Sequence, residues 1–185
     1  MKILIASDIH GSAKYCRMLL DRYEKENAGR LVLLGDILYH GPRNDLPEKY
    51  APKQVIEMLN AHREEIFCVR GNCEAEVDQM VLGFPVLADY ALLPLGERMI
   101  YMTHGHVFNK EHLPPMKAGD ILLHGHTHVP VCEAFGPYMY MNPGSVSIPK
   151  DSTPRSYMTL EGETFTWKTL EGETFRQYPA GRCTG

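Results

Sequence analysis

The chain has 185 residues, 44% of them hydrophobic, and a formal net charge of −4, which suits one globular domain that buries its own core. Because 23 acidic residues outnumber 19 basic ones, the composition offers no basic field for long nucleic acid and no polybasic stretch for a membrane surface.

The first half alternates apolar runs with amphipathic segments, in the order expected for strands and helices. Residues 3–6 and 31–34 are typical of strands buried on both faces. Ser12 can cap a helix between these strands, and Pro52 can open another helix after them. Residues 66–81 then fit a third strand followed by a short helix. The alternation predicts a largely parallel sheet with right-handed crossovers.

From about residue 89 the pattern changes to strands with short connections, and the second half should form a more antiparallel sheet. The segment TLEGETF occurs at 159–165 and again at 169–175. Each copy places Glu-Gly between two runs whose residues alternate between the two faces of a strand. This pattern predicts a three-stranded meander with glycine in its turns. In the middle run, Phe165 and Trp167 should share one face. We expect one domain over residues 1–185, with the last few residues frayed.

The beginning and the cysteines of the chain bear on its location. The apolar run at the amino end meets Asp8 too early for a membrane span or a signal-peptide core. The five cysteines are scattered and form no CxxC pair, a pattern typical of reduced thiols in the cytosol. A cytoplasmic location is therefore expected.

Side chains that can bind a metal directly follow five of the predicted strands. They are Asp8, His10, Asp36, Asn72, His104, His126 and His128. Because ligands of open α/β sheets collect at the carboxyl ends of strands, these side chains should converge on one place. Seven ligands are too many for one ion, but they suit two ions about 4 Å apart, with a carboxylate such as Asp36 between them.

The donor set also restricts the metal. Four imidazoles give too much nitrogen for Mg²⁺ or Ca²⁺ alone, and the thiolates of a structural zinc site are missing from the set. We therefore expect two divalent transition metal ions, Mn²⁺ first, with Zn²⁺, Fe, Co or Ni as alternatives.

Five short blocks resemble the signature blocks of the calcineurin-like metallophosphoesterases, in the order of that family. The blocks are DIH at 8–10, GD at 35–36, GNCE at 71–74, HGH at 104–106 and GHTH at 125–128. Longer stretches such as GDILYHGPRN and NPGSVSIPK are similar to those of its small bacterial phosphodiesterases. The resemblance implies a four-layer α/β/β/α sandwich of two mixed sheets flanked by helices, with a metal site at the strand carboxyl ends.

By the same resemblance, the seven side chains divide between two metals. The ligands of the first are Asp8, His10 and His128, those of the second are Asn72, His104 and His126, and Asp36 joins both. The implied reaction is hydrolysis of a small phosphodiester, in which a hydroxide bridging the ions attacks phosphorus in line.

Other residues near these blocks are candidates for the remaining roles. The wider family often has histidine where this chain has Cys73, and a thiol is a poor general acid. The leaving-group proton could come from Cys73, His106 or a metal-bound water, and Cys73 could instead be a packed small side chain. His40 and Arg43 are candidates for substrate binding. The alternatives are that His40 only covers the site and that Arg43 forms a solvated ion pair at the surface.

Three functions stay open on this framework. The first is a metal-dependent phosphodiesterase, and the second is a phosphomonoesterase or nucleotide pyrophosphohydrolase at the same site. The third is a non-catalytic protein-binding scaffold, like the retromer subunit that this fold resembles. The full set of seven ligands favours an enzyme. His124, inside an apolar run, should be a packed core histidine, and the NPGS block at 142–145 is either a turn or a buttress of the site. The sequence leaves a homo-oligomer open.

Overall fold

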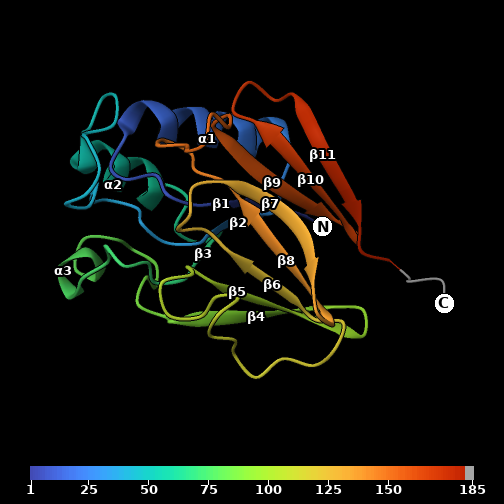
Figure 1. Cartoon of the computed structure of the whole chain (residues 1–185). Helices are drawn as coiled ribbons and strands as arrows, with labels where there is room; N and C mark the ends of the chain where they lie inside the picture. The colour runs from blue at the N-terminus through green and yellow to red at the C-terminus, as the bar shows by residue number, and fades with distance from the viewer. Residues whose placement is uncertain (182–185) are drawn as a thin grey trace.

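Two mixed β-sheets packed face to face make up most of the structure, a computed structural model that describes residues 1–181 (Figure 1). Within these residues the first sheet has six strands, in the order β11-β10-β9-β1-β2-β3, and the second has five, in the order β4-β5-β6-β8-β7. The expected fraying of the chain end concerns residues 182–185, which lie outside the described residues.

The first sheet joins a parallel half to an antiparallel half. Its strands are β1 (Lys2–Ala6), β2 (Arg30–Leu33), β3 (Ile66–Cys68), β9 (Ser156–Glu161), β10 (Thr164–Thr169) and β11 (Thr174–Pro179). Strands β1, β2 and β3 are parallel, as the alternation of strand and helix predicted. The predicted meander is also present, and β9 attaches it to β1 in antiparallel fashion.

Two helices cover the outer face of the first sheet (Figure 1). Helix α1 (Ala13–Lys25) begins where predicted, since the Ser12 hydroxyl accepts a hydrogen bond from the backbone N–H of Tyr15 at 3.4 Å. Helix α2 (Pro52–Asn60) has its proline in the first turn, where no helical N–H is needed. Among residues 1–181, no helix is long and apolar enough to cross a membrane.

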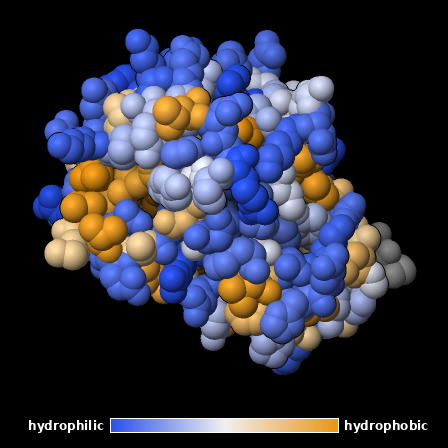
Figure 2. Space-filling model, turned by 60° about the vertical axis from the view of Figure 1, so that its left-hand side comes forward, coloured by the Kyte–Doolittle hydropathy of each residue, from blue (hydrophilic) through white to orange (hydrophobic). Residues whose placement is uncertain are grey.

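The third helix, α3 (Glu76–Gln79), is a single turn and shorter than the sequence predicted. None of its side chains is buried, and the apolar side chains of Val77 and Met80 are 61% and 83% exposed. A segment that buries no apolar face lacks the packing that extends a helix. Figure 2 turns this side of the molecule forward and shows a mainly hydrophilic surface with separate hydrophobic patches.

The second sheet is more parallel than expected. Its strands are β4 (Tyr90–Leu95), β5 (Arg98–Thr103), β6 (Ile121–His124), β7 (Pro130–Phe135) and β8 (Tyr138–Pro143). Strands β5, β6 and β8 run parallel to one another, and the antiparallel pairs lie at the two edges. The second half is still more antiparallel than the first, as predicted, because β4–β5, β7–β8 and the meander are antiparallel. The parallel pair β5–β6 was not expected, and it arises because residues 104–120 form a crossover, not a hairpin.

A hydrophobic core between the two sheets fixes the position of one sheet on the other. Phe165 and Trp167 lie on one face of β10, as predicted, and both are fully buried there. The indole N–H of Trp167 donates to the backbone carbonyl of Asn142 on β8 at 2.7 Å. Since β10 and β8 belong to different sheets, this hydrogen bond fixes how one sheet lies on the other. In this arrangement the strand ends of both sheets meet along one edge.

Glu26 ties the end of α1 to three strands of the first sheet. Its carboxylate accepts from Tyr157 Oη at 2.9 Å, Lys168 Nζ at 2.6 Å and Lys2 Nζ at 3.4 Å. Burial raises the pKa of Glu26, but the hydrogen bonds from Lys168 and Tyr157 outweigh burial and hold the pKa below its usual range. A depressed carboxyl pKa in the folded state stabilises the fold only while the group is ionised.

We therefore expect Glu26→Gln to lower the free energy of unfolding by about 1 kcal/mol at pH 7. The difference from the wild type should shrink as the pH falls below the ordinary glutamate pKa of about 4.3 and through the lower folded value. Urea unfolding at pH 7 and at acid pH measures both. Glu24→Gln, exposed on the same helix, is the matched control, and a pH-independent difference would contradict the ionic role of Glu26.

Candidate metal centre

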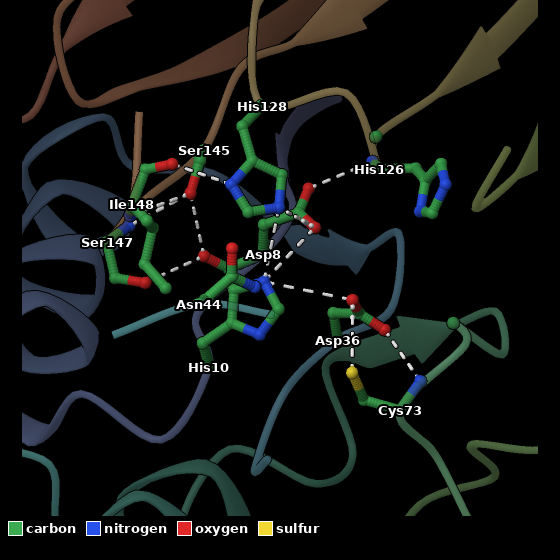
Figure 3. A network of polar contacts seen from close by, with 12 residues as sticks. Asp8, His10, Asp36, Asn44, Cys73, His126, His128, Ser145, Ser147 and Ile148 are labelled. Carbon is green, nitrogen blue, oxygen red and sulfur yellow. Dashed lines mark hydrogen bonds and ion pairs between the residues drawn. The ribbon is translucent and has the colours of Figure 1, made fainter. Parts of the chain in front are cut away.

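The structure brings all seven predicted ligand side chains together where the strands of both sheets end. In Figure 3, Asp8, His10 and His128 form one cluster. Asp8 Oδ1 lies 3.2 Å from His128 Nε2 and 3.6 Å from His10 Nε2. The two Nε2 atoms lie 3.3 Å apart. These three residues are the set that the sequence assigned to one metal.

A second cluster lies beside the first, and Asp36 lies between them. His104 Nε2 is 3.1 Å from Asn72 Oδ1 and 3.1 Å from His126 Nδ1. Asp36 Oδ2 approaches a histidine of each cluster, His104 Nε2 at 3.4 Å and His10 Nε2 at 3.7 Å. Only Asn72 is exposed at the surface. Asp36 therefore lies between the two clusters and within 3.7 Å of a histidine of each.

Backbone carbonyls set the direction of three of the imidazoles. The Nδ1 atoms of His10, His104 and His128 lie 2.8, 2.7 and 2.6 Å from the carbonyl oxygens of Tyr39, Leu34 and Ile148. Because a carbonyl only accepts, Nδ1 carries the proton and Nε2 turns its lone pair toward the carboxylates. Lone pairs and carboxylate oxygens that face one another repel unless positive charge lies between them.

The carboxylates draw positive charge into both clusters. Burial lowers the pKa of His104, but its hydrogen bond and charge interactions with Asp36 and Asp8 outweigh burial and raise the pKa to about 9. Burial and the charge of His104 lower the pKa of His126 to about 4, so that its imidazole is neutral. Protons or metal ions can supply the positive charge that the site demands, and a neutral imidazole is the form that binds a metal.

Much of the centre is built on strained backbone. Five of the seven side chains belong to residues with positive φ, namely Asp8 (61°), His10 (49°), Asp36 (55°), His126 (65°) and His128 (64°). Each such residue costs on the order of 1 kcal/mol or more, and it persists only where the surroundings determine it. Strain of this kind clusters at functional sites.

Glycines let the ligand-bearing turns approach each other closely. A Cβ on Gly71 would lie 2.2 Å from Asp36 Oδ1, and a Cβ on Gly35 would lie 2.5 Å from the backbone nitrogen of Gly71. A larger residue at position 71 would displace Asp36, and one at position 35 would displace the backbone of Gly71. The sequence pattern of a glycine beside each ligand therefore has a steric cause.

Glu74 joins the same two turns through hydrogen bonds. The sequence pattern predicted no separate role for this residue. Its side chain is 4% exposed and accepts from the backbone N–H groups of Asp36 at 2.9 Å, Ile37 at 2.8 Å and Gly71 at 2.6 Å. Burial and the charge of Asp36 raise its pKa, while the three N–H groups oppose that rise. Its place in the GNCE block, two residues after Asn72, was the available signal.

The NPGS block does buttress the site. The hydroxyl of Ser145, the last residue of this block, and that of Ser147, two residues after it, both donate to the backbone carbonyl of Asp8 at 3.0 Å (Figure 3). His124 is the core histidine that the sequence predicted. It is 3% exposed, burial lowers its pKa to about 4, and its ring lies 4.6 Å from that of Tyr140.

Of the two candidates for the leaving-group proton, Cys73 contacts Asp36 directly, whereas His106 lies beside His104. The backbone N–H of Cys73 donates to Asp36 Oδ1 at 2.9 Å, and its thiol donates to Oδ2 at 3.4 Å (Figure 3). Burial and then Asp36 raise the pKa of this thiol. The His106 ring lies 5.4 Å from that of His104, and its Nδ1 is buried without a hydrogen-bond partner among the described residues.

The two substrate candidates also differ. Arg43 lines a hollow of about 630 Å³ together with Asp36, Asn72 and Cys73. The ring of His40 instead packs between those of Tyr39 and Tyr50, with centroids 4.7 and 5.3 Å away. This packing fits the alternative that His40 covers the site. Lys150, which the sequence reasoning did not single out, lines the same hollow as Arg43.

Two mixed sheets with paired histidine and carboxylate clusters at their strand ends define a calcineurin-like phosphoesterase. The family model described as "Calcineurin-like phosphoesterase superfamily domain" matches residues 1–164, and the chain belongs to this family. The chain is 47% identical to Phosphodiesterase YfcE of Escherichia coli (strain K12) over 166 residues, 90% of each protein.

The structural comparisons agree with this assignment. The structure of Yfce, a phosphoesterase from E. coli, matches with a TM-score of 0.94 and 44% identity, over 98% of this chain and 100% of that one. Vps29 of Entamoeba histolytica, complexed with Zn²⁺, matches with a TM-score of 0.61 and 20% identity, over 98% and 100% of the two chains. The second match shows the fold alone. The predicted sandwich of two mixed sheets flanked by helices is confirmed.

Proposed function

We propose that the protein is a metal-dependent phosphodiesterase that hydrolyses small phosphodiesters. The observation that carries the proposal is the pair of linked ligand clusters, with Asp36 Oδ2 3.4 Å from His104 of one and 3.7 Å from His10 of the other. The identity of 47% to a protein named a phosphodiesterase supports the diester as substrate.

The donor set fits two divalent transition metal ions. Asp8, His10 and His128 would hold one ion, Asn72, His104 and His126 the other, and Asp36 both. Asp8 Oδ1 is buried and, among the described residues, receives no hydrogen bond, as expected of an oxygen that binds a cation. We propose Mn²⁺, and the same donors are compatible with Zn²⁺, Fe, Co or Ni. Bound ions supply Lewis acidity, which lowers the pKa of water and polarises phosphoryl oxygens.

The residues of the chain take the remaining roles. Arg43 lies where it can neutralise a phosphoryl oxygen. Cys73 keeps its proton, because burial and Asp36 raise its pKa, and it orients Asp36 through two hydrogen bonds. His106, with an unpaired Nδ1 beside the ligand cluster, is the group we assign to protonation of the leaving oxygen.

Excess chelator should reduce hydrolysis of bis(p-nitrophenyl) phosphate to less than a tenth, and added Mn²⁺ should restore it. Elemental analysis of the purified protein should give about two metal ions per chain. Equal activity with and without chelator would contradict the proposal. Assays with p-nitrophenyl phosphate distinguish the alternative of a phosphomonoesterase, which should hydrolyse this monoester faster than the diester.

Other expectations from the sequence stay predictions. We infer one domain over residues 1–185, because both sheets share the core around Trp167. A cytoplasmic location is supported by the scattered cysteines. Light scattering of the purified protein gives its mass in solution and so tests whether the chain forms a homo-oligomer.

A further inference from the structure

Two hollows flank the candidate metal centre, and His126 and Thr127 line both of them. One hollow, of about 630 Å³, contains Arg43 and Lys150, and we call it the cationic hollow. The other, of about 470 Å³, contains three carboxylates, and we call it the acidic hollow. A phosphodiester has two substituents on phosphorus, so a diester bound at the metal centre can extend one arm into each hollow.

The two hollows differ in charge. Neither Arg43 nor Lys150 has an ion-pair or hydrogen-bond partner for its side chain in the described part of the chain, and the only carboxylate of the cationic hollow is the ligand Asp36. In the acidic hollow, by contrast, Lys110 is paired with Glu133 at 2.5 Å.

The acidic hollow therefore carries excess negative charge. Beyond the Lys110–Glu133 pair, Glu111 and Asp151 add two further carboxylates. Its remaining wall is formed by uncharged side chains, among them Val129, Val131 and Tyr140. An arm with a negative charge would be repelled here and attracted in the cationic hollow.

One strained turn separates these charges. Lys150 lines the cationic hollow and the next residue, Asp151, lines the acidic one. Asp151 and Ser152 have positive φ angles of 54° and 56°, a conformation that residues other than glycine adopt at a cost. The Lys150 carbonyl accepts from the hydroxyl of Thr153 at 2.6 Å, and the Lys150 N–H donates to the carbonyl of the ligand residue His128 at 3.4 Å. The turn is thus fixed to the metal centre.

We propose that the preferred substrate is an asymmetric phosphodiester with one further negatively charged arm, such as a carboxylate, and one uncharged arm. The charged arm lies beside Arg43 and Lys150, and the uncharged arm lies against Val129, Val131 and Tyr140. This inference rests on the proposed phosphodiesterase function and names its substrate class. Lys150 is the specificity residue that the structure adds to the candidates from the sequence.

Two matched chromogenic diesters test the proposal with the Mn²⁺-loaded protein. The probes are p-nitrophenyl 2-carboxyethyl phosphate and its neutral counterpart, p-nitrophenyl 3-hydroxypropyl phosphate. The wild type should show a kcat/KM about fivefold or more higher for the carboxylate probe, and added salt should reduce this ratio. Lys150→Ala should lower the ratio about fivefold, mainly through KM, and Lys150→Glu should lower it further. Arg43→Ala also removes the contact to the shared phosphoryl oxygen, so it should lower kcat/KM for both probes in addition to lowering the ratio.

Lys53→Ala is the matched control, because Lys53 is an exposed lysine on α2 that lines neither hollow. It should keep the wild-type ratio. An equal loss for both probes in Lys150→Ala would overturn the proposal, since Lys150 would then contact the shared phosphoryl group. A wild-type ratio near one would also overturn it while the phosphodiesterase function stands. Failure to hydrolyse either probe with metal present would refute the function itself.

Discussion

Replacing Asp36 with asparagine should lower kcat/KM for a phosphodiester by about 10³-fold. Asp36 Oδ2 is the carboxylate oxygen that approaches both His104 and His10, so in the proposed two-metal centre its charge would act on both ions. An amide of the same shape keeps the packing but loses the negative charge that holds two cations together. The metal content should fall from about two ions per chain to one or fewer.

Two measurements separate this loss from misfolding. The thermal midpoint of Asp36→Asn should stay within a few degrees of the wild type, because the substitution changes no volume. Asp21→Asn, on the exposed face of α1, controls for the removal of a carboxylate as such. A variant that keeps both metals and more than a tenth of the activity would rule out a bridging role for Asp36.

Glu74→Ala should lower the free energy of unfolding by about 3–4 kcal/mol, the largest stability effect that we expect. Three buried N–H groups, those of Asp36, Ile37 and Gly71, would lose their acceptor, and each unsatisfied group costs about 1–3 kcal/mol. Because all three groups belong to the two turns that carry Asp36 and Asn72, metal affinity should also fall, by about 10- to 100-fold. Urea unfolding and metal titration measure the two effects.

The conservative variant and a neighbouring residue sharpen this test. Glu74→Gln retains one acceptor oxygen, so its loss of stability should lie between the wild type and Glu74→Ala. Glu76→Ala, at an exposed position of α3, should leave the unfolding midpoint and the metal affinity unchanged. If Glu74→Ala unfolds at the same urea concentration as the wild type, the three hydrogen bonds do not hold the turns together.

The parallel strands and their helices could be predicted because periodicity and caps are local. Apolar runs at 3–6 and 31–34, with Ser12 between them, are sufficient for a strand-helix-strand unit. Strand direction in the second sheet is not local. An apolar run is the same in either direction, and only the path of residues 104–120 makes β5 and β6 parallel. Likewise, alternation predicted the meander but not its pairing with β1.

The residues of the site also fall into those that local sequence predicts and those that depend on distant segments. The seven predicted ligands could be found because each follows a strand, and strand ends converge for topological reasons. Glu74 and Lys150 owe their roles to backbone groups and hollows built by distant segments. The hydrogen bonds of Glu74 to Asp36 and Ile37 span 38 and 37 residues of chain, and no spacing rule in a single sequence reports such a contact.

At five of the predicted ligand residues the left-handed backbone lowers stability, while the side chain supplies a donor atom to the proposed metal centre. Glycine at any of these positions would relax the main chain by on the order of 1 kcal/mol, but it would delete the donor atom. Directed evolution for heat resistance alone would therefore tend to replace these residues by glycine, giving more stable proteins that lack the donor atoms of the proposed metal centre.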